Sequence, residues 1–523
     1  MKPAFSFDEI REAERKIIEE DSVPSLILME NAGKNAFEQI LLSFPDIDDY
    51  EIFIIAGKGN NAGDGFVIAR HLLIAELPLT VVMLSAETEL KGDALVNYRL
   101  FAKENENFND TISFQQFVNS YKKRNRILLI DTILGSGVKG TLSEDFSNAI
   151  NFINKIKEKN KRFKIVSIDV PSGLMSGEQI NPVVDADITI TMGALKTELL
   201  YGEGKEHAGD IFVIPIGISD GYLERYNTYN KYAVEFDDVV KLYPKRKKTS
   251  YKYSNGKALI IGGSAGLSGA VIMSSVSALK SGAGAVVAAI PETIASHFSR
   301  KLPDVIKELL DTTAEGSISG SAFRKILRRI ESSDAVLIGP GISLNNETRN
   351  FVFDVVKKCS RNMIIDADAL TILAEDTNVL INREYDSEII LTPHIGEFAR
   401  LSGVSTNDII HNRFDTVRYF VNKYKVSVVL KSETSFSCLK NKATYINTTG
   451  NESLGVVGSG DVLSGILVSI LAQTGDVFKT LICGNYIHGF CSDLYFKKYG
   501  NKQSASQQDF IKLIPKALTY FLN

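Results

Sequence analysis

Short apolar runs of strand length recur along the whole chain and limit its fold more than any other feature. They begin at residues 51, 79, 126, 164, 186 and 211 in the first half, and at 257, 285, 335, 363, 388 and 426 in the second. Polar or periodic segments long enough for helices separate most of them. This alternation predicts α/β folds with parallel sheets wrapped by helices. Functional loops are then expected at the carboxyl ends of the strands.

Two domains are expected from the length of 523 residues, because single cores stop growing at roughly 250 to 300 residues. A polar and aromatic segment, 220–256, separates the two sets of apolar runs and contains a basic cluster at 245–248. We expect that cluster to be a solvated linker, since short charge runs normally stay in water. The predicted domains are residues 1–228 and 229–523.

The charge balance gives no reason to expect nucleic acid or a membrane surface as a partner. Lys and Arg total 59 against 63 Asp and Glu, which produces no strong overall field. The four cysteines form no CxxC pair. The N-terminal segment is too charged for a signal peptide, and no apolar run approaches the roughly 20 residues of a membrane-spanning helix. We therefore expect a cytoplasmic protein with free thiols.

The N-terminal segment predicts an amphipathic helix. Ser6 and Glu9 have the spacing of a capping box, in which each residue satisfies a free backbone N–H of the other. Ile10, Ala13 and Ile17 follow at helical spacing and would form its apolar face.

A glycine-rich loop, GKGNNAGDG at 57–65, follows the first long apolar run and precedes a helical pattern. Such a turn lets the backbone approach a ligand, although a purely structural turn is the alternative. The spacing is not GxGxxG with a later acidic residue, which disfavours an ordinary dinucleotide-dependent dehydrogenase. Asn60, Asn61 and Asp64 supply the hard oxygen atoms that alkali or alkaline-earth ions prefer.

Two further strands of the first half end in aspartate. Asp131 precedes a second glycine-rich loop, and Asp169 stands three residues before Ser172. A single aspartate in such a place is more often a helix cap or turn residue. Because three polar loops converge at one edge of a parallel sheet, we favour a site in which one carboxylate acts as a base.

In the second half, the run GVVGSGDVLSG at 455–465 places glycines directly before an aspartate and a helical stretch. The backbone N–H groups of Gly458, Ser459 and Gly460 can form an anion hole for a phosphate in transfer. Asp461 can take a proton from a hydroxyl that attacks phosphorus. The alternative is a helix N-terminal acid favoured by the helix dipole.

Two more polar residues follow strands of the second half. His394 lies in LTPHIGE, and Lys431 ends VSVVLK, where an ammonium could meet a phosphate. A solvated or capping histidine and a plain strand end are the alternatives. Taken alone, these residues predict a ribokinase-like small-molecule kinase.

Five motifs of the first half together resemble the NAD(P)H-hydrate epimerase domain. They are LMENAG at 28–33, GKGNNAGDG at 57–65, DTILGSGVKG at 131–140, IDVPSGL at 168–174 and TMGALK at 191–196. The resemblance implies a Rossmann-like three-layer fold. It also implies equilibration of the R and S epimers at the hydrated ring carbon of NAD(P)H.

The epimerase resemblance also implies site residues. Asp169 would contact the nicotinamide end and is the candidate acid/base residue, while Asn61, Asp131 and Ser172 would surround a potassium ion. The other implied hydrate contacts are Asn60, Ala62, Gly63, Asp64, Gly135, Ser136, Gly137, Val138, Lys139, Gly140 and Thr141.

Six motifs of the second half resemble the NAD(P)H-hydrate dehydratase domain, a ribokinase-fold relative. They are GGSAGLSGA at 262–270, GPG at 339–341, DADAL at 366–370, LTPHIGE at 391–397, VVLK at 428–431 and GSGDVLSG at 458–465. The resemblance implies loss of the S hydrate's hydroxyl at the expense of ADP in bacterial enzymes, or of ATP in eukaryotic ones. Val456 and Val457 stand where family members commonly have threonine and glycine.

The dehydratase resemblance assigns Asp461 to deprotonate the hydrate's hydroxyl, with Mg²⁺ bridging phosphates. Residues 458–460 would stabilise the charge. Ala265, Gly341 and His394 would join Asp461 in contacting the hydrate. The implied nucleotide contacts are Lys431, Ser432, Glu433, Thr434, Ser435 and Gly460.

The sequence thus predicts a bifunctional repair enzyme, with epimerase first and ADP-dependent dehydratase second, acting as a homo-oligomer. A vitamin or sugar kinase with an accessory N-terminal domain is the alternative. A dimerising scaffold in the first half is disfavoured, because Asn61, Asp131, Asp169 and Ser172 are all present.

Overall fold

The computed structural model describes residues 1–104, 111–120, 126–246, 248–249, 255–440 and 443–522. Within the basic cluster 245–248, Lys247 lies outside the described residues. The chain divides into two compact units, Lys2–Tyr229 and Asn230–Asn523, with Met1 grouped with the second. Each unit is described by itself.

A parallel sheet forms the centre of the N-terminal unit, with strand order β4-β3-β2-β5-β6-β7-β9. The bounds of these strands are β2 Glu51–Ala56, β3 Leu79–Met83, β4 Thr111–Ser113, β5 Ile127–Thr132, β6 Phe163–Ile168, β7 Ile188–Met192 and β9 Asp210–Ile214. The helices are α1 Phe7–Glu19, α2 Ser25–Ser43, α3 Asn60–Ile74, α4 Gly92–Glu104, α5 Phe114–Ser120, α6 Glu144–Lys159, α7 Gly202–His207 and α8 Asp220–Leu223.

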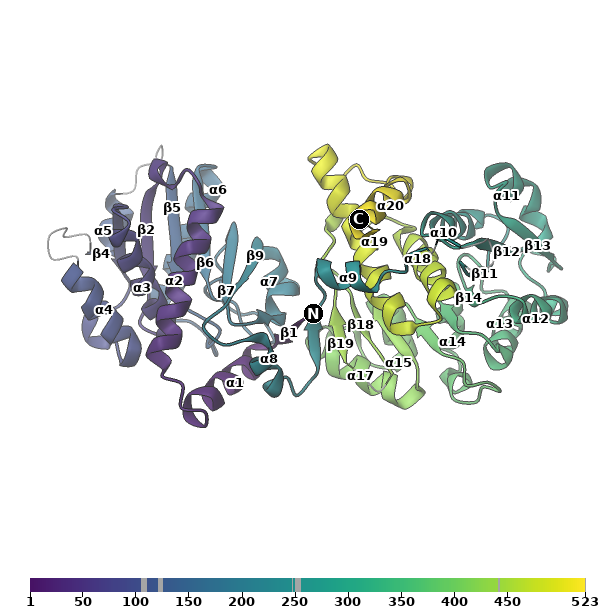
Figure 1. The fold of residues 1–523 in the computed structure, drawn as a ribbon, viewed down its shortest axis with the longest axis horizontal. Helices are drawn as coiled ribbons and strands as arrows, with labels where there is room; N and C mark the ends of the chain where they lie inside the picture. The colour runs from purple at the N-terminus through teal and green to yellow at the C-terminus, as the bar shows by residue number, and fades with distance from the viewer. Residues whose placement is uncertain (105–110, 121–125, 247, 250–254, 441–442, 523) are drawn as a thin grey trace. The chain divides into compact units, whose positions relative to one another are not determined.

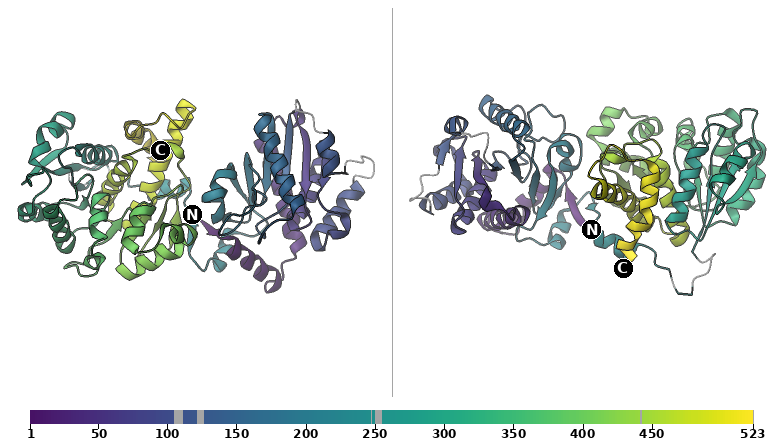
Figure 2. Two further views of the ribbon diagram at one scale, coloured as in Figure 1. Left: turned by 180° about the vertical axis from the view of Figure 1, so that it is seen from behind. Right: turned by 90° about the horizontal axis from the view of Figure 1, so that it is seen from above.

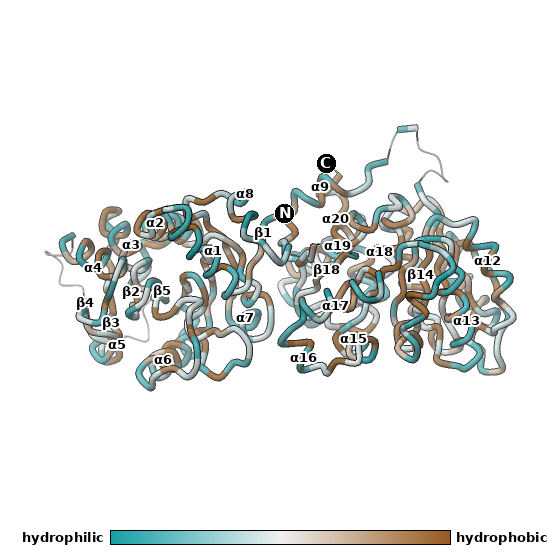
Figure 3. The backbone as a smooth tube through the Cα atoms, turned by 90° about the horizontal axis from the view of Figure 1, so that it is seen from below, coloured by the Kyte–Doolittle hydropathy of each residue, from teal (hydrophilic) through white to brown (hydrophobic). Residues whose placement is uncertain are grey.

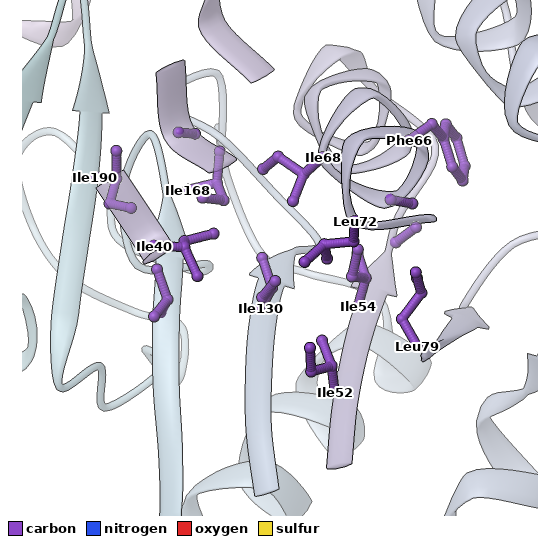
Figure 4. Close-up of a cluster of buried hydrophobic side chains, with 14 of the residues drawn as sticks. Ile40, Ile52, Ile54, Phe66, Ile68, Leu72, Leu79, Ile130, Ile168 and Ile190 are labelled. Atoms are coloured by element: carbon purple, nitrogen blue, oxygen red, sulfur yellow. The ribbon is translucent and has the colours of Figure 1, made fainter. Parts of the chain in front are cut away.

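Helices cover both faces of this sheet because alternate strand residues point to opposite sides. Side chains from α2, α3 and α4 pack on one face, where Ile54, Ile130 and Ile168 meet Ile68 and other apolar residues (Figure 4). Side chains from α5 and α6 pack on the other face. The N-terminal unit therefore has three layers, as predicted from the sequence (Figure 1).

A short parallel pair, β1 Lys2–Phe5 and β8 Leu195–Lys196, lies in the N-terminal unit beside this sheet. Its register places Phe5 opposite Lys196. The capping box predicted for α1 is confirmed, because Ser6 and Glu9 each accept a hydrogen bond from the other's backbone N–H.

The sheet of the C-terminal unit has the strand order β13-β12-β11-β14-β15-β16-β17-β18-β19-β10. Neighbours from β13 to β17 are parallel, and β18 is antiparallel to both β17 and β19. The strands are β10 Lys231–Ala233, β11 Lys257–Ile261, β12 Ala285–Pro291, β13 Ile306–Leu310, β14 Ala335–Ile338, β15 Met363–Ile365, β16 Ile389–Leu391, β17 Ser427–Leu430, β18 Phe436–Cys438 and β19 Thr444–Ile446.

The helices of the C-terminal unit are α9 Phe236–Leu242, α10 Ser268–Lys280, α11 Ala295–Lys301, α12 Phe323–Glu331, α13 Asn346–Lys358, α14 Asp368–Leu373, α15 Ile395–Ser402, α16 Thr406–His411, α17 Arg413–Tyr424, α18 Ser459–Thr474, α19 Val477–Tyr499 and α20 Gln507–Leu522. Figure 2 shows the helices and sheet of each unit from two further directions. Among the described residues, none of these helices has the length and apolar character needed to span a bilayer.

Strand β14 is buried along its whole length, as expected for a strand covered on both faces. Figure 3 shows that this strand and the largely hydrophilic helix α12 differ in hydropathy. Side chains of α10 and α18 pack together on the sheet. These two helices approach closely at Gly465, where an added Cβ would lie 2.3 Å from the Ser274 carbonyl oxygen. The predicted α/β class with parallel sheets is confirmed in both units.

Candidate active sites

Asp131 is the buried centre of the N-terminal site, at the end of β5. Its carboxylate accepts hydrogen bonds from Ser167 Oγ at 2.8 Å, from the Ile133 N–H at 3.2 Å, and from the N–H and Oγ of Ser172 at 3.0 and 2.5 Å. Burial raises the pKa of Asp131, and the hydrogen bonds from Ser172 and Ser167 oppose this shift. Asp131 and Ser172, which lie 41 residues apart in sequence, are therefore in direct contact.

Asn61, in the first turn of α3, brings an oxygen without a partner to the same place. Its Nδ2 donates to the Leu134 carbonyl oxygen at 2.9 Å, and Ser172 Oγ donates to that carbonyl at 3.1 Å. The Oδ1 atom of Asn61 is buried and has no hydrogen-bond partner among the described residues. Because buried polar atoms are rarely left unsatisfied, this oxygen marks a place for a donor or a cation.

Asp169 follows β6 in a backbone conformation that is strained for a residue with a side chain, since its φ is +69°. Its Oδ1 lies 2.8 Å from Lys196 Nζ, and its Oδ2 accepts the Ser136 N–H at 3.1 Å. The ammonium of Lys196 also donates to Thr191 Oγ1 and to the Met192 carbonyl oxygen. A buried ammonium with these three acceptors holds Asp169 next to the loop 135–141.

The sequence analysis did not identify Lys196 as a site residue. Its side chain is only 2% exposed. The signal was present, because TMGALK places a lysine in an otherwise apolar stretch directly after a strand. Lysine is almost never fully buried unless its charge is paired.

Asp64 is also buried, one turn into α3. Burial raises its pKa well above the usual value, and the charge of Asp169 adds to the shift. Ala62 and Gly63 are buried and Asn60 is exposed. Within the loop 135–141, Gly135 lies against Asp169, and the Gly140 carbonyl oxygen accepts from Asn181.

In the C-terminal unit, helix α18 begins at Ser459, directly after Gly458, whose φ is +91°. The first N–H groups of a helix have no partner within the helix, so Gly460 and Asp461 can offer theirs to an anion. The Ser459 N–H, by contrast, donates to the Val456 carbonyl oxygen at 3.2 Å. Ser459 Oγ lies 3.2 Å from Nε2 of the buried His488, on α19. Burial lowers the pKa of His488 to about 4, so the ring is neutral. His488 lies in the middle of the long helix α19, and this position gave no sequence signal.

Lys431, after β17, points to the start of α18. Its Nζ lies 2.9 Å from Asp366 Oδ1 and 4.0 Å from Glu397 Oε2. A Cβ added at Gly460 would lie 3.2 Å from the same Nζ. Burial disfavours the charge of Lys431, but Asp366 and Glu397 outweigh burial and raise its pKa. Asp366, from the DADAL motif, was not predicted as a site residue.

Asp461 faces this lysine from the first turn of α18. Burial raises its pKa to about 7, the charge of Asp366 adds to the shift, and Lys431 opposes it. A carboxyl group that titrates near neutral pH is well matched to accept a proton during a reaction.

Three further residues predicted for this unit, His394, Ala265 and Gly341, fall into two groups. His394 is the N-cap of α15, and its Nδ1 accepts from the N–H groups of Gly396 and Glu397 at 3.0 and 3.2 Å. An isolated parallel β-bridge joins the backbone of His394 to that of Lys431. The second group is Ala265 and Gly341. Ser264 Oγ donates to the Gly341 carbonyl oxygen at 2.9 Å, and Ala265, the residue after Ser264, is exposed.

The segment 431–435 leaves β17 as a compact turn. Ser432 Oγ donates to the Thr434 carbonyl oxygen at 2.8 Å, and Glu433 pairs with Arg413 at 3.0 Å. The Ser435 carbonyl oxygen accepts from the Asn447 N–H. The neighbouring Val457, which precedes the start of α18, is 93% exposed.

Both halves of the chain match families of known proteins. Residues 258–516 match the family described as NAD(P)H-hydrate dehydratase, and residues 25–198 match the family described as YjeF-related protein N-terminus. A bifunctional NAD(P)H-hydrate repair enzyme of Dictyoglomus turgidum is 31% identical over 519 residues, covering 98% of this chain and 97% of that protein. The corresponding Escherichia coli protein is 28% identical over 500 residues, covering 95% and 90%.

Among solved structures, the ADP/ATP-dependent NAD(P)H-hydrate dehydratase of Bacillus subtilis, co-crystallised with ATP and Mg²⁺, is 24% identical. It covers 55% of this chain and 99% of that chain, with a TM-score of 0.47. A ribokinase-like superfamily protein of Enterococcus faecalis is 22% identical, covering 56% and 98%, with a TM-score of 0.49.

The raised pKa of Asp461 predicts a pH-dependent effect of Asp461→Asn on stability. Because the folded pKa of about 7 lies above the ordinary 3.8, this carboxyl favours folding at low pH, and that contribution is lost as the pH rises through 7. The variant should match the wild type at about pH 4 and be more stable by about 1–3 kcal/mol at about pH 8.

Urea unfolding at both pH values measures this difference. Asp386→Asn is the control, since the Asp386 side chain is 93% exposed and should give no pH-dependent gain. Equal stability of wild type and Asp461→Asn at the higher pH would contradict the buried environment assigned to Asp461.

Proposed function

This chain belongs to the family of bifunctional NAD(P)H-hydrate repair enzymes, and from that membership we propose a division of labour between its units. Residues 1–228 interconvert the R and S epimers of hydrated NAD(P)H. Residues 229–523 dehydrate the S epimer to NAD(P)H at the expense of ADP, which gives AMP and phosphate. The observation that carries the proposal is the placement of Asp461 beside Lys431 at the start of α18.

In the C-terminal site, Asp461 takes the proton of the hydrate's hydroxyl as its oxygen attacks the terminal phosphorus of ADP. The bond from that phosphorus to the bridging oxygen breaks, and AMP leaves. Backbone N–H groups at the start of α18, that of Gly460 among them, hold the charge on the transferred phosphoryl group. Lys431, kept in place by Asp366, adds a positive charge beside them.

The phosphorylated hydroxyl then leaves as phosphate. The lone pair of the ring nitrogen replaces the broken C–O bond, and a proton is lost from the neighbouring ring carbon to give NAD(P)H. A kinase-like site suits this dehydration because the hydroxyl is first phosphorylated and then leaves as phosphate. A kinase would instead release a stable phosphorylated product.

Mg²⁺, when bound, would neutralise negative charge on the phosphates of ADP. No group of three or more His, Cys, Asp or Glu side chains suited to a metal occurs in the described part of the chain. This fits an ion held mainly by nucleotide phosphates and water, with one or two carboxylates. Ala265, Gly341 and His394 are proposed to contact the hydrate, and the turn 431–435 to contact the nucleotide.

In the N-terminal site, the ring carbon to be inverted carries both the hydroxyl and the ring nitrogen. The hydroxyl takes a proton and leaves as water while the nitrogen lone pair forms a C=N bond. Water then adds to the opposite face, gives a proton to a base, and returns the electron pair to nitrogen. We assign Asp169 as the base, since its carboxylate lies at the end of β6 and is held in place by Lys196 Nζ at 2.8 Å. The loop 135–141 and residues 60–64 are proposed to hold the hydrate.

Potassium fits the donors of this site. Asn61 Oδ1, the Asp131 carboxylate and Ser172 Oγ are all oxygens, and the first has no partner among the described residues. An oxygen donor set suits a hard cation. When bound, K⁺ would supply a positive charge beside the bound hydrate.

Separate inactivation of the two activities tests the division of labour. Asp461→Asn removes the proton acceptor of the dehydratase, so dehydration should fall by about 10²–10⁴-fold while epimer exchange persists. Asp169→Asn should slow epimer exchange by a similar factor and leave dehydration of pure S hydrate intact. Recovery of reduced-nicotinamide absorbance measures dehydration, and chromatographic separation of the epimers measures exchange. Loss of both activities in either folded variant would refute two separate sites.

Thermal unfolding with and without K⁺ tests the cation proposal. A bound ion stabilises the folded state by about 1.4 kcal/mol at ten times its dissociation constant, so K⁺ should raise the melting temperature of the wild type. Asn61→Ala should abolish this rise, and the exposed Asn119→Ala should retain it. An unchanged response in Asn61→Ala would exclude Asn61 as a ligand.

We further propose a homo-oligomer that acts in the cytoplasm, where NAD(P)H is used. Sedimentation of the purified chain tests the oligomeric state, and a monomer at assay concentrations would contradict it.

A further inference from the structure

Helix α19 carries a stripe of polar and small residues along one side. Asn485, His488, Gly489, Ser492 and Asp493 follow one another at helical spacing, so they share one face of the helix. All of them except Asp493 are buried. Because buried polar groups need hydrogen-bond partners, this face must be matched by another part of the chain.

The segment 447–451, which precedes the start of α18 in the chain, supplies partners for this stripe. The Asp493 carboxylate accepts a hydrogen bond from Asn451 Nδ2 at 2.9 Å. A Cβ added at Gly489 would lie 2.5 Å from the Thr449 carbonyl oxygen. The absence of a side chain at that position therefore lets the segment lie directly against α19.

His488, in the middle of the stripe, is joined to the first residue of α18. Its Nε2 lies 3.2 Å from Ser459 Oγ, and both residues are buried. Burial lowers the pKa of His488 to about 4, so the ring is uncharged at neutral pH. An uncharged imidazole has one donor and one acceptor nitrogen, and it binds a hydroxyl group through a hydrogen bond. This bond ties the start of α18 to α19.

The start of α18 is also confined on other sides. A Cβ added at Gly458 would lie 2.6 Å from a side chain of α10, and one added at Gly460 would lie 3.2 Å from Lys431 Nζ. Ser459 stands between these two glycines and provides the contact with α19. Because the Gly460 N–H and the Asp461 carboxylate follow directly, a shift of Ser459 would move both of them relative to Lys431.

We propose that His488 is a positioning residue of the dehydratase site, which holds the start of α18 through the Ser459 hydroxyl so that the Gly460 N–H and Asp461 face the transferred phosphoryl group. This inference rests on the dehydration proposed for the C-terminal unit. N–H groups that are fixed in advance stabilise the charge of a transition state without having to reorient. His488 is assigned no contact with either substrate, and its effect passes through Ser459.

Steady-state kinetics of dehydration with S hydrate, ADP and Mg²⁺ test this role. His488→Leu removes the hydrogen bond, so kcat should fall by about 10–10²-fold while the KM values for hydrate and ADP change little. Glutamine ends in a donor and an acceptor, so His488→Gln can form the same bond and should retain most of the wild-type kcat. His297→Leu is the control, because this histidine of α11 is exposed and should keep the wild-type kcat.

Ser459→Ala removes the same hydrogen bond from the other side, so it tests the inference even if His488→Leu fails to fold. Its kcat should fall as in His488→Leu. The double variant should show no further loss, because two changes that act through one bond are not additive. Epimer exchange should persist in every variant, since the N-terminal site is unaltered.

Three results would overturn the inference and leave the proposed function intact. They are a wild-type kcat in folded Ser459→Ala, equal losses in His488→Gln and His488→Leu, and losses that multiply in the double variant. A rise in KM without a fall in kcat would also overturn it, because the bond would then serve substrate binding only. If the wild type recovered no NAD(P)H from S hydrate and ADP, the proposed function would fail, and this inference with it.

Discussion

In each unit a lysine, fully buried in the N-terminal unit and partly buried in the C-terminal unit, pairs with an aspartate at the carboxyl end of a parallel strand, and the chemistry of both sites depends on these pairs. Lys196 lies 2.8 Å from Asp169, and Lys431 lies 2.9 Å from Asp366. An unpaired charge in such a place would cost several kcal/mol. Each pair is therefore a fixed charge distribution that sets the proton affinity of every carboxyl group around it.

The two units use this arrangement differently. In the N-terminal unit, the lysine touches the proposed base Asp169 directly, and burial holds the pKa of the nearby Asp64 well above its usual value. In the C-terminal unit, the lysine is held by Asp366. Burial raises the pKa of the proposed base Asp461 to about 7, the charge of Asp366 adds to the shift, and Lys431 opposes it. A carboxyl of that kind can accept a proton from a hydroxyl and release it again at neutral pH.

The sequence was sufficient to predict the strands, the parallel sheets and the loops at their ends, because apolar runs and glycine-rich turns are local signals. It also placed Asp131 with Ser172, which the structure joins by hydrogen bonds. The partners of the charged residues could not be predicted. Lys196 in β8 meets Asp169, which follows β6, and Ser459 at the start of α18 meets His488 on α19; both contacts join separate elements.

The most direct test of this account is an assay of mixed R and S hydrates, with ADP, Mg²⁺ and K⁺, on Lys196→Met and Lys431→Met. The wild type should convert both epimers to NAD(P)H. Lys196→Met should stop when the S fraction is consumed, because its dehydratase is intact and its epimer exchange is lost. Lys431→Met should recover little NAD(P)H while still equilibrating the epimers. If both folded variants lost both activities, or if either converted the whole mixture at the wild-type rate, the account of two lysine-paired sites acting in sequence would be wrong.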